Sequence, residues 1–488
     1  MIAPNSTDLL PLYVDLDGTL TPSDTLHESV MRLARQEPLA LLQLPLWLAG
    51  GKAALKQQLG DRVLPDPATL PWRDDLIEVL RAERERGRNV VLASASDIRT
   101  VRAVAEHLGC FTDVLGTEPG GPNLSRRAKR EAIERHARGL GFERWAYVGN
   151  SRDDLPVWDG AAEAWAVNAP AGVLQALRAD HPQARVFPRE PLTLGTVLKA
   201  IRLKQWAKNA LLFVPLLAAH SLDPNAWLQA LLAFVAFGLC ASATYLVNDL
   251  LDLPSDRVHR IKRHRPLAAG RMGIATAVVL GLVMLGAAFV LAVMLHEYGH
   301  VAAYRVCGHA DAQFRLIPLL GGVSISARIP SSHLADLFIT LMGAAGGLAP
   351  MMLLFAASDL LYPQLPALSD YLYIQASVIG FLGAFNLLPF WPLDGGRIVR
   401  LLTFTFAPRA TRAVSILMSA AAAAAAVATQ SYFLLCFVLI GWQGLIRSEQ
   451  LIGLQRGMSK QSGGWALAAY LFTTATFLVV AWPILAQF

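Results

Sequence analysis

The stretch Tyr13-Val-Asp-Leu-Asp-Gly-Thr-Leu-Thr21 places two carboxylates, Asp15 and Asp17, directly after a short apolar run. Similar runs at 89–93, 145–148 and 164–167 alternate with helical stretches over residues 1–190. This alternation predicts an α/β domain with a mostly parallel sheet. Such folds build their sites at the carboxyl ends of the strands, so we expect both carboxylates to belong to a site there.

The Asp-x-Asp-Gly-Thr pattern resembles the haloacid dehalogenase superfamily of phosphatases. The resemblance implies a Rossmann-like fold, with Asp15 as the nucleophile that forms an aspartyl-phosphate and Asp17 as general acid and base. It also implies Mg²⁺, which would neutralise the phosphoryl oxygens. A solvated strand end is the alternative interpretation of the two acids, and a phosphatase fold with weak activity is another.

Further motifs of that superfamily follow in the expected order. By this resemblance Ser94 binds phosphate, Lys129 stabilises the phosphoryl group, and Asp154 binds Mg²⁺ together with Asp15 and Asp17. Asn150 stands where the superfamily usually has another acid. This departure predicts a site with a lower affinity for Mg²⁺, or one in which Asp153 takes the place of the missing acid.

Residues 22–88 are predicted to form a helical cap on this domain. They contain the apolar stretch Leu39–Gly50, which is interrupted by Pro45. A stretch of this length is shorter than the roughly 17–25 residues that a membrane-spanning helix needs. We interpret it as cap core or as a membrane-facing surface.

Composition changes after the linker marked by Pro182, Pro188 and Pro191. The chain is 54% hydrophobic and 16% charged with a net charge of +6, and its basic excess falls after residue 195. Lys and Arg beside apolar runs are topology signals, so we expect no nucleic-acid partner.

The four cysteines have no paired spacing. They therefore suggest neither disulfides nor a cysteine metal site.

The second part of the chain is predicted to be an all-α polytopic membrane region. We expect a multi-pass protein of the cell inner (plasma) membrane, in contact with the lipid bilayer, with its N-terminal domain in the cytoplasm. Most of the apolar segments reach spanning length, and the sixth is long enough for two passes. They lie near 209–220, 226–251, 273–295, 334–357, 371–391, 413–446 and 464–486.

An acidic motif, Asn248-Asp-Leu-Leu-Asp-Leu-Pro-Ser-Asp256, follows the second apolar segment. On a helix Asp249, Asp252 and Asp256 share one face. Carboxylates at the end of a membrane helix are costly unless they have a function. Mg²⁺ that bridges them to a diphosphate is one such function, because this cation prefers carboxylate and phosphate oxygens.

This motif resembles the first Asp-rich motif of UbiA-type polyprenyl-diphosphate transferases. The resemblance implies that Asn248, Asp249, Asp252 and Asp256 bind Mg²⁺-diphosphate, with Arg257, Lys262 and Arg265 as basic partners. A second Asp-rich motif, which that family has, does not follow in this sequence. The segment 191–285 therefore resembles a truncated prenyltransferase.

A third motif, His296-Glu-Tyr-Gly-His300, follows about 23 apolar residues. On a helix its two histidines lie one turn apart and can bind one Zn²⁺, with Glu297 beside the metal-bound water. Later in the chain, Asp394 ends an apolar segment in Asn386-Leu-Leu-Pro-Phe-Trp-Pro-Leu-Asp-Gly-Gly-Arg397.

Together these motifs resemble the site-2 protease family of intramembrane zinc metalloproteases. The resemblance implies Asp394 as third zinc ligand, Glu297 as catalytic base, and Asn386 as the residue that positions a membrane-protein peptide substrate. Gly321 and Gly322 fit the short strand that follows the zinc-binding helix in this family.

The basic residues give conflicting topologies. The block from Arg257 to Arg271 and the arginines after His300 both suggest a cytoplasmic side. A helix that crosses once between them allows only one of these assignments. A junction inside 273–295, where a transferase helix joins a protease helix, explains the conflict.

We therefore predict a phosphatase-like domain at 1–190, a partial transferase at 191–285 and a zinc protease at 286–488. One alternative is an enzyme of prenyl lipid metabolism that acts on a prenyl diphosphate or phosphate ester. Another is a chimera without function.

Overall fold

The computed structural model describes residues 9–188, 191–213, 217, 220, 224–317, 321–363, 366–428, 435, 438, 439 and 452–485. They form two compact units. The first comprises Met1–Ala207 with Cys240–Leu285, and the second comprises Lys208–Leu239 with Gly286–Phe488. The domain boundaries given above stay predictions.

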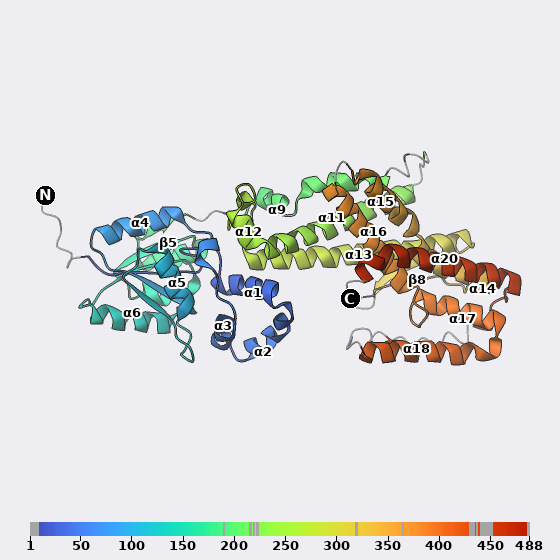
Figure 1. Ribbon diagram of the computed structural model, residues 1–488, viewed down its shortest axis with the longest axis horizontal. Coiled ribbons are helices and arrows are strands. Elements are labelled where there is room, and N and C mark those ends of the chain that lie inside the picture. The colour runs from blue at the N-terminus through green and yellow to red at the C-terminus, as the bar shows by residue number, and fades with distance from the viewer. Residues whose placement is uncertain are drawn as a thin grey trace. The chain divides into compact units, whose positions relative to one another are not determined.

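The first unit contains a six-stranded parallel sheet (Figure 1). Its strand order is β3-β2-β1-β4-β5-β6. In the centre, Leu12 pairs with Val90 on one side and with Ala146 on the other. The strands are β1 (Leu12–Val14), β2 (Val90–Asp97), β3 (Asp113–Thr117), β4 (Ala146–Gly149), β5 (Glu163–Val167) and β6 (Arg185–Phe187). The predicted α/β class is confirmed, and two strands at the sheet edges, β3 and β6, are added to the four expected.

Alternation along the central strands builds a core on each face of the sheet. Leu12 and Val14 belong to a core that includes helices α4 and α5, whereas Tyr13 belongs to the core on the opposite face. Successive strand residues point to opposite faces, so one short strand serves both cores. The helices are α4 (Asp74–Glu85), α5 (Ile98–Leu108), α6 (Arg127–Gly139), α7 (Leu155–Trp158) and α8 (Ala171–Asp180).

Between β1 and α4 the chain forms a separate group of short helices. This group has its own small core, made by Leu33, Trp47, Leu55 and Leu59 among others. Asp24 caps the first helix by accepting a hydrogen bond from the backbone N–H of Leu26. The group comprises α1 (Thr25–Gln36), η1 (Pro38–Gln43), α2 (Leu44–Ala49) and α3 (Lys52–Gly60), followed by η2 (Pro67–Thr69).

The helices that follow the sheet are α9 (Leu194–Ala200), η4 (Leu203–Phe213), α11 (Pro224–Leu251), α12 (Leu253–Val258), η5 (Lys262–His264) and α13 (Ile274–Val306). Helix α13 is continuous across the predicted junction at 273–295. Its 33 residues measure about 50 Å, more than the hydrocarbon thickness of a bilayer, about 30 Å.

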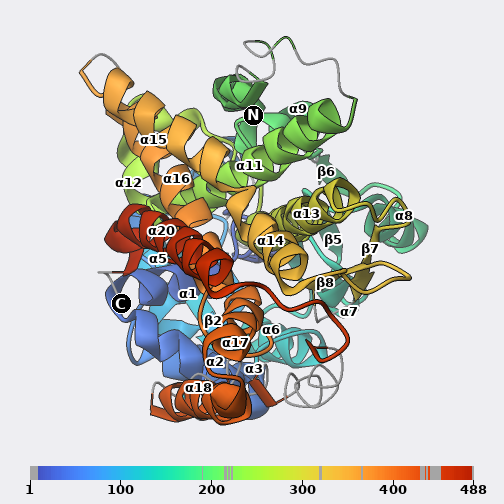
Figure 2. The ribbon, with the colours of Figure 1, turned by 90° about the vertical axis from the view of Figure 1, so that its right-hand side faces the viewer.

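The second unit contains a helical bundle and a β-hairpin of β7 (Gln313–Ile317) and β8 (Gly321–Ile325) (Figure 2). Helix α16 packs against α15 and α20, and α14 packs against α17. The helices are α14 (His333–Ala345), α15 (Leu348–Leu361), α16 (Pro366–Asn386), α17 (Asp394–Phe406), η6 (Pro408–Ala410), α18 (Thr411–Ala428) and α20 (Lys460–Leu485).

Among the described residues, five helices are long and apolar enough to cross a membrane. The chain is a multi-pass membrane protein. Helix α16 covers most of the segment expected near 371–391 but is not one of the five. Two of the expected apolar segments are described only in part. In the segment near 209–220 most residues after Phe213 lie outside the described residues, and in the segment near 413–446 most residues after Ala428 do. The five are Ala230–Leu251, Ile274–Val306, His333–Leu361, Pro408–Ala428 and Lys460–Trp482.

Candidate functional site

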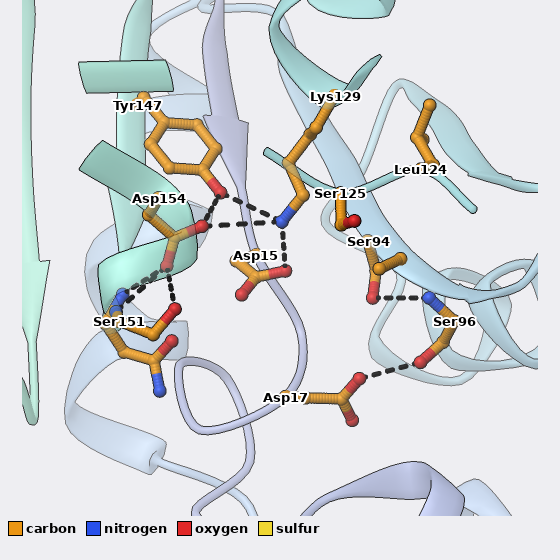
Figure 3. A network of polar contacts seen from close by, with 12 residues as sticks. Asp15, Asp17, Ser94, Ser96, Leu124, Ser125, Lys129, Tyr147, Ser151 and Asp154 are labelled. Atoms are coloured by element: carbon orange, nitrogen blue, oxygen red, sulfur yellow. Dashed lines mark hydrogen bonds and ion pairs between the residues drawn. The ribbon is translucent and has the colours of Figure 1, made fainter. Parts of the chain in front are cut away.

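Asp15, Lys129 and Asp154 converge at the carboxyl end of the central strands (Figure 3). The Lys129 ammonium donates to Asp15 Oδ1 at 2.8 Å and lies 3.5 Å from Asp154 Oδ1. All three side chains are buried. Because β1 pairs directly with β4, the residues that follow these strands meet at one point.

The Asp154 carboxylate is the most fully hydrogen-bonded group of this site. It accepts bonds from the backbone N–H groups of Asn150 and Ser151, from the Ser151 hydroxyl, and from the Tyr147 hydroxyl at 2.5 Å. Burial alone would raise the pKa of Asp154, but the Lys129 charge and these bonds hold that pKa below its usual range. Asp154 is therefore an anion within the site.

Tyr147 was not among the predicted site residues. Its ring lies on β4, and its hydroxyl also accepts a hydrogen bond from Lys129 at 3.0 Å. A buried tyrosine hydroxyl needs a partner, and Tyr147 stands seven residues before the predicted Mg²⁺ ligand Asp154. The need of this hydroxyl for a nearby partner is the signal from which the role of Tyr147 in the site could have been inferred.

Asp17 lies where the short helical group meets β2. One carboxylate oxygen accepts from the Thr25 backbone N–H, and the other accepts from the Ser96 hydroxyl, each at 2.7 Å. Burial and the nearby Asp24 raise the pKa of Asp17. Ser94 is fully buried on the same strand, where its hydroxyl oxygen accepts from the Ser96 N–H.

Asn150 packs over the loop that carries the two aspartates. A Cβ at Gly18 would overlap the Asn150 amide, and Gly18 has φ +75°, so both space and backbone conformation require glycine there. Asp153 is half exposed and pairs with Arg126 at 2.7 Å. The structure therefore brings Asn150 to the site and ties Asp153 to a surface arginine.

The donor set of this pocket fits a divalent cation. Burial raises the pKa of Asp15 to about 7, Lys129 opposes the rise, and the neighbouring carboxylates Asp154 and Asp17 add to it. Two carboxylates, those of Asp15 and Asp154, thus contact the single ammonium group of Lys129, which leaves an excess of negative charge at this contact. Carboxylate oxygens are the ligands that Mg²⁺ prefers, so Asp15 and Asp154 fit this ion.

The acidic motif of the middle segment forms an ion-pair cluster. Arg265 Nη1 lies 3.0 Å from Asp249 and 2.5 Å from Asp256, and thereby joins the two acids. Arg202 pairs with Asp249, and Lys262 pairs with Asp256. Of the other two residues predicted to bind Mg²⁺-diphosphate, Asp252 is half-buried and Asn248 is exposed.

Arg257, expected beside a diphosphate, pairs instead with the first helix of the short helical group. Its guanidinium donates to both carboxylate oxygens of Glu28, at 2.7 and 3.1 Å, and to the Thr69 carbonyl. The Ser23 hydroxyl also donates to Glu28. Arg257 and Glu28 are both almost fully buried, so each neutralises a charge that would otherwise be costly.

In the second unit, His296, His300 and Asp394 converge. Asp394 Oδ2 lies 3.1 Å from His296 Nε2 and 3.3 Å from His300 Nε2, and the two nitrogens are 3.2 Å apart. Four ligands at about 2.0–2.1 Å from a tetrahedral Zn²⁺ are separated by roughly 3.3 Å. The three atoms therefore fit three corners of a zinc site.

Neighbouring groups hold these side chains in place. His300 Nδ1 lies 2.8 Å from the Ile339 carbonyl; if it donates there, Nε2 is free to bind a metal. The Ser324 hydroxyl on β8 donates to Glu297 Oε2 at 2.5 Å and orients that carboxylate. Asn386, by contrast, donates to the Leu382 carbonyl of its own helix. Ser324 was not predicted, because the contact depends on the hairpin register.

Three protein families match different segments of the chain. A model of the haloacid dehalogenase-like hydrolases matches residues 12–159, one of the UbiA prenyltransferase family matches 210–303, and one of Peptidase family M50 matches 362–428. These segments agree with the three resemblances stated from the sequence motifs. The UbiA match includes His296 and His300, whereas the M50 match includes Asp394.

Several curated proteins are similar to parts of the chain. The uncharacterised protein y4nM of Sinorhizobium fredii is 35% identical over 63% of this chain and 59% of its own length. Decaprenyl-phosphate phosphoribosyltransferase of Mycobacterium tuberculosis is 45% identical over 20% of this chain and 34% of its own. The chain thus spans less than two thirds of these relatives.

A phosphoserine phosphatase structure, a phospho-aspartyl intermediate analogue, matches 39% of the chain at 18% identity with a TM-score of 0.29.

Replacing Gly343 with alanine tests the zinc site. A Cβ at this position would overlap the His300 imidazole, so Gly343→Ala should displace that ligand. We expect bound zinc to fall about tenfold or more, as measured by metal analysis of the purified protein. Gly346→Ala, three residues along the chain, meets only ordinary or slightly tight contacts and is the control. Full zinc content in Gly343→Ala would contradict the geometry.

Proposed function

We propose that the chain is an intramembrane zinc metalloprotease that cleaves membrane-embedded peptide segments and carries a Mg²⁺-dependent phosphatase domain. The observation that carries the protease assignment is the convergence of His296, His300 and Asp394 within 4.8 Å of one another. The match of residues 362–428 to Peptidase family M50 supports it.

His296, His300 and Asp394 would hold the zinc ion. When bound, Zn²⁺ lowers the pKa of a water molecule and polarises the scissile carbonyl. Glu297 accepts a proton from the attacking water and delivers it to the leaving amine. Ser324 keeps the Glu297 carboxylate in one orientation, which a proton acceptor of fixed geometry requires.

The second proposed activity is hydrolysis of a phosphate ester by the N-terminal domain. The observation that carries it is the buried contact of Lys129 with Asp15 beside Asp154. Asp15 attacks phosphorus to form an aspartyl-phosphate while Asp17 protonates the leaving oxygen, and Lys129 balances the charge of the phosphoryl group. Asp17 then takes a proton from a water molecule that attacks the phosphorus, which releases phosphate and restores Asp15. Mg²⁺, held by Asp15 and Asp154 with Asp17 nearby, neutralises phosphoryl oxygens when bound.

An activity in prenyl lipid metabolism is the alternative, and similarity to decaprenyl-phosphate phosphoribosyltransferase favours it. The ion pairs of Asp249 and Asp256 oppose it, because Arg202, Lys262 and Arg265 occupy the carboxylates that a Mg²⁺-diphosphate would need. We therefore assign no prenyl transfer. The proposal keeps the expectation that the N-terminal domain is cytoplasmic and that the zinc site lies in the inner membrane.

Glu297→Gln separates zinc binding from peptide cleavage. Glutamine keeps the shape of the side chain but cannot accept the proton, so cleavage of a model transmembrane peptide should fall by about 10²–10⁴-fold. Bound zinc should stay unchanged. Asp359→Asn, on an exposed position of α15, is the matched control and should cleave normally. Equal cleavage by Glu297→Gln and the control would refute the protease proposal.

Asp15→Asn tests the phosphatase domain. Removing the nucleophilic oxygen should reduce hydrolysis of small phosphoesters by about 10²-fold or more. Asp153→Asn is the control, because Asp153 pairs with Arg126 at the surface, and it should keep most of the activity. A large loss in Asp153→Asn would instead show that this residue has taken over the role of the acid missing at position 150.

The raised pKa of Asp15 predicts a pH dependence for the same reaction. With a pKa of about 7, the carboxyl group is protonated at lower pH and is then no nucleophile. At low Mg²⁺ we expect kcat/KM to fall as the pH drops through about 7. Saturating Mg²⁺ should move this fall to lower pH, because a nearby cation favours the ionised form. A profile that does not depend on Mg²⁺ would contradict the prediction.

A further inference from the structure

The short helices η1 and α2 expose four leucines. Leu39, Leu42 and Leu46 are 79%, 80% and 74% exposed, and Leu48 is 52% exposed. These four residues are named the leucine face. Full burial of a leucine is favourable by about 1.5–3 kcal/mol, so four exposed within ten positions are an unusual feature of a folded domain.

The leucine face is not needed for the core of its own helical group. That core is supplied by Ala40 and Trp47, with Leu41 and Leu44 packed against it. The segment therefore has one side that packs inward and another that is apolar and uncovered. An amphipathic segment of this kind is typical of helices that lie in a membrane interface.

The length and charge pattern of the segment agree with an interfacial position. Pro38–Ala49 is apolar but too short to cross a bilayer. No charged residue stands between Glu37 and Lys52. Arg35 and Lys52, on either side of the run, are both exposed and suited to anionic lipid headgroups.

We propose that the leucine face docks on the lipid bilayer that the chain itself crosses. The five candidate spans keep the domain tethered at a membrane, so docking needs no encounter from solution. The four leucines would then lie at the boundary of headgroups and acyl chains, with Arg35 and Lys52 among the headgroups. This inference does not depend on either proposed activity.

A fluorescent amino acid sensitive to its environment, placed at position 46 of the full chain, tests the docking. The protein is reconstituted in nanodiscs of mixed zwitterionic and anionic phospholipids, with and without spin-labelled lipid. The matched control carries the same probe at Leu140, an exposed leucine (41%) outside the leucine face. We expect blue-shifted emission and several-fold stronger quenching at position 46 than at position 140.

A second variant keeps the test decisive. The double substitution Leu39→Glu and Leu42→Glu changes two exposed side chains, so the protein should still fold. The temperature at which the protein melts checks this. Quenching at position 46 should fall to the level of position 140. Equal quenching at both positions in the unsubstituted chain overturns the proposal. A blue shift at position 46 without quenching by spin-labelled lipid also overturns it, because a protein surface would then cover the face.

Discussion

The contact between Lys129 and Asp15 is the interaction on which the N-terminal site depends. A buried carboxylate is costly unless it is paired, and the buried carboxylates of Asp15 and Asp154 meet at the carboxyl ends of β1 and β4. Lys129 offsets part of this charge, and the hydrogen bonds to Asp154 stabilise another part. The remaining excess suits a Mg²⁺ ion. The same need for charge compensation recurs along the chain, where Arg265 joins Asp249 to Asp256 and Arg257 pairs with Glu28.

The three residues of the candidate zinc site come from segments that match different families. His296 and His300 lie in α13, at the end of the UbiA match, and Asp394 begins α17, within the M50 match. Nevertheless three ligand atoms meet with the separations of a tetrahedral site. Gly343 leaves room for the His300 ring, and the Ile339 carbonyl fixes its tautomer if Nδ1 donates there. Gly343 and Ile339, both on a third helix, α14, thus leave space for the His300 ring and orient it.

Local patterns in the sequence predicted the parts of the structure that depend on local spacing. Buried apolar runs indicated β1, β2, β4 and β5, and one helical turn indicated the two histidines. Strand β3 was missed because Asp113 and Gly116 interrupt its apolar pattern, and β6 was missed because it lies between Pro182 and Pro188, in the stretch interpreted as a linker. Arg202 and Ser324 were missed for another reason. Their contacts with Asp249 and Glu297 join residues that are distant in sequence, and no spacing in one segment encodes them.

The length of α13 limits where the candidate zinc site can lie. From Ile274 to His296 the helix rises about 33 Å, close to the hydrocarbon thickness of a bilayer, about 30 Å. If Arg271 lies at one interface, His296 is near the other, where water is available for hydrolysis. The helix then continues for about another 15 Å to Val306, into or beyond the headgroups. The basic residues Arg271 and Arg305 consequently stand at opposite ends of one helix, and a single crossing can satisfy the positive-inside preference of only one of them.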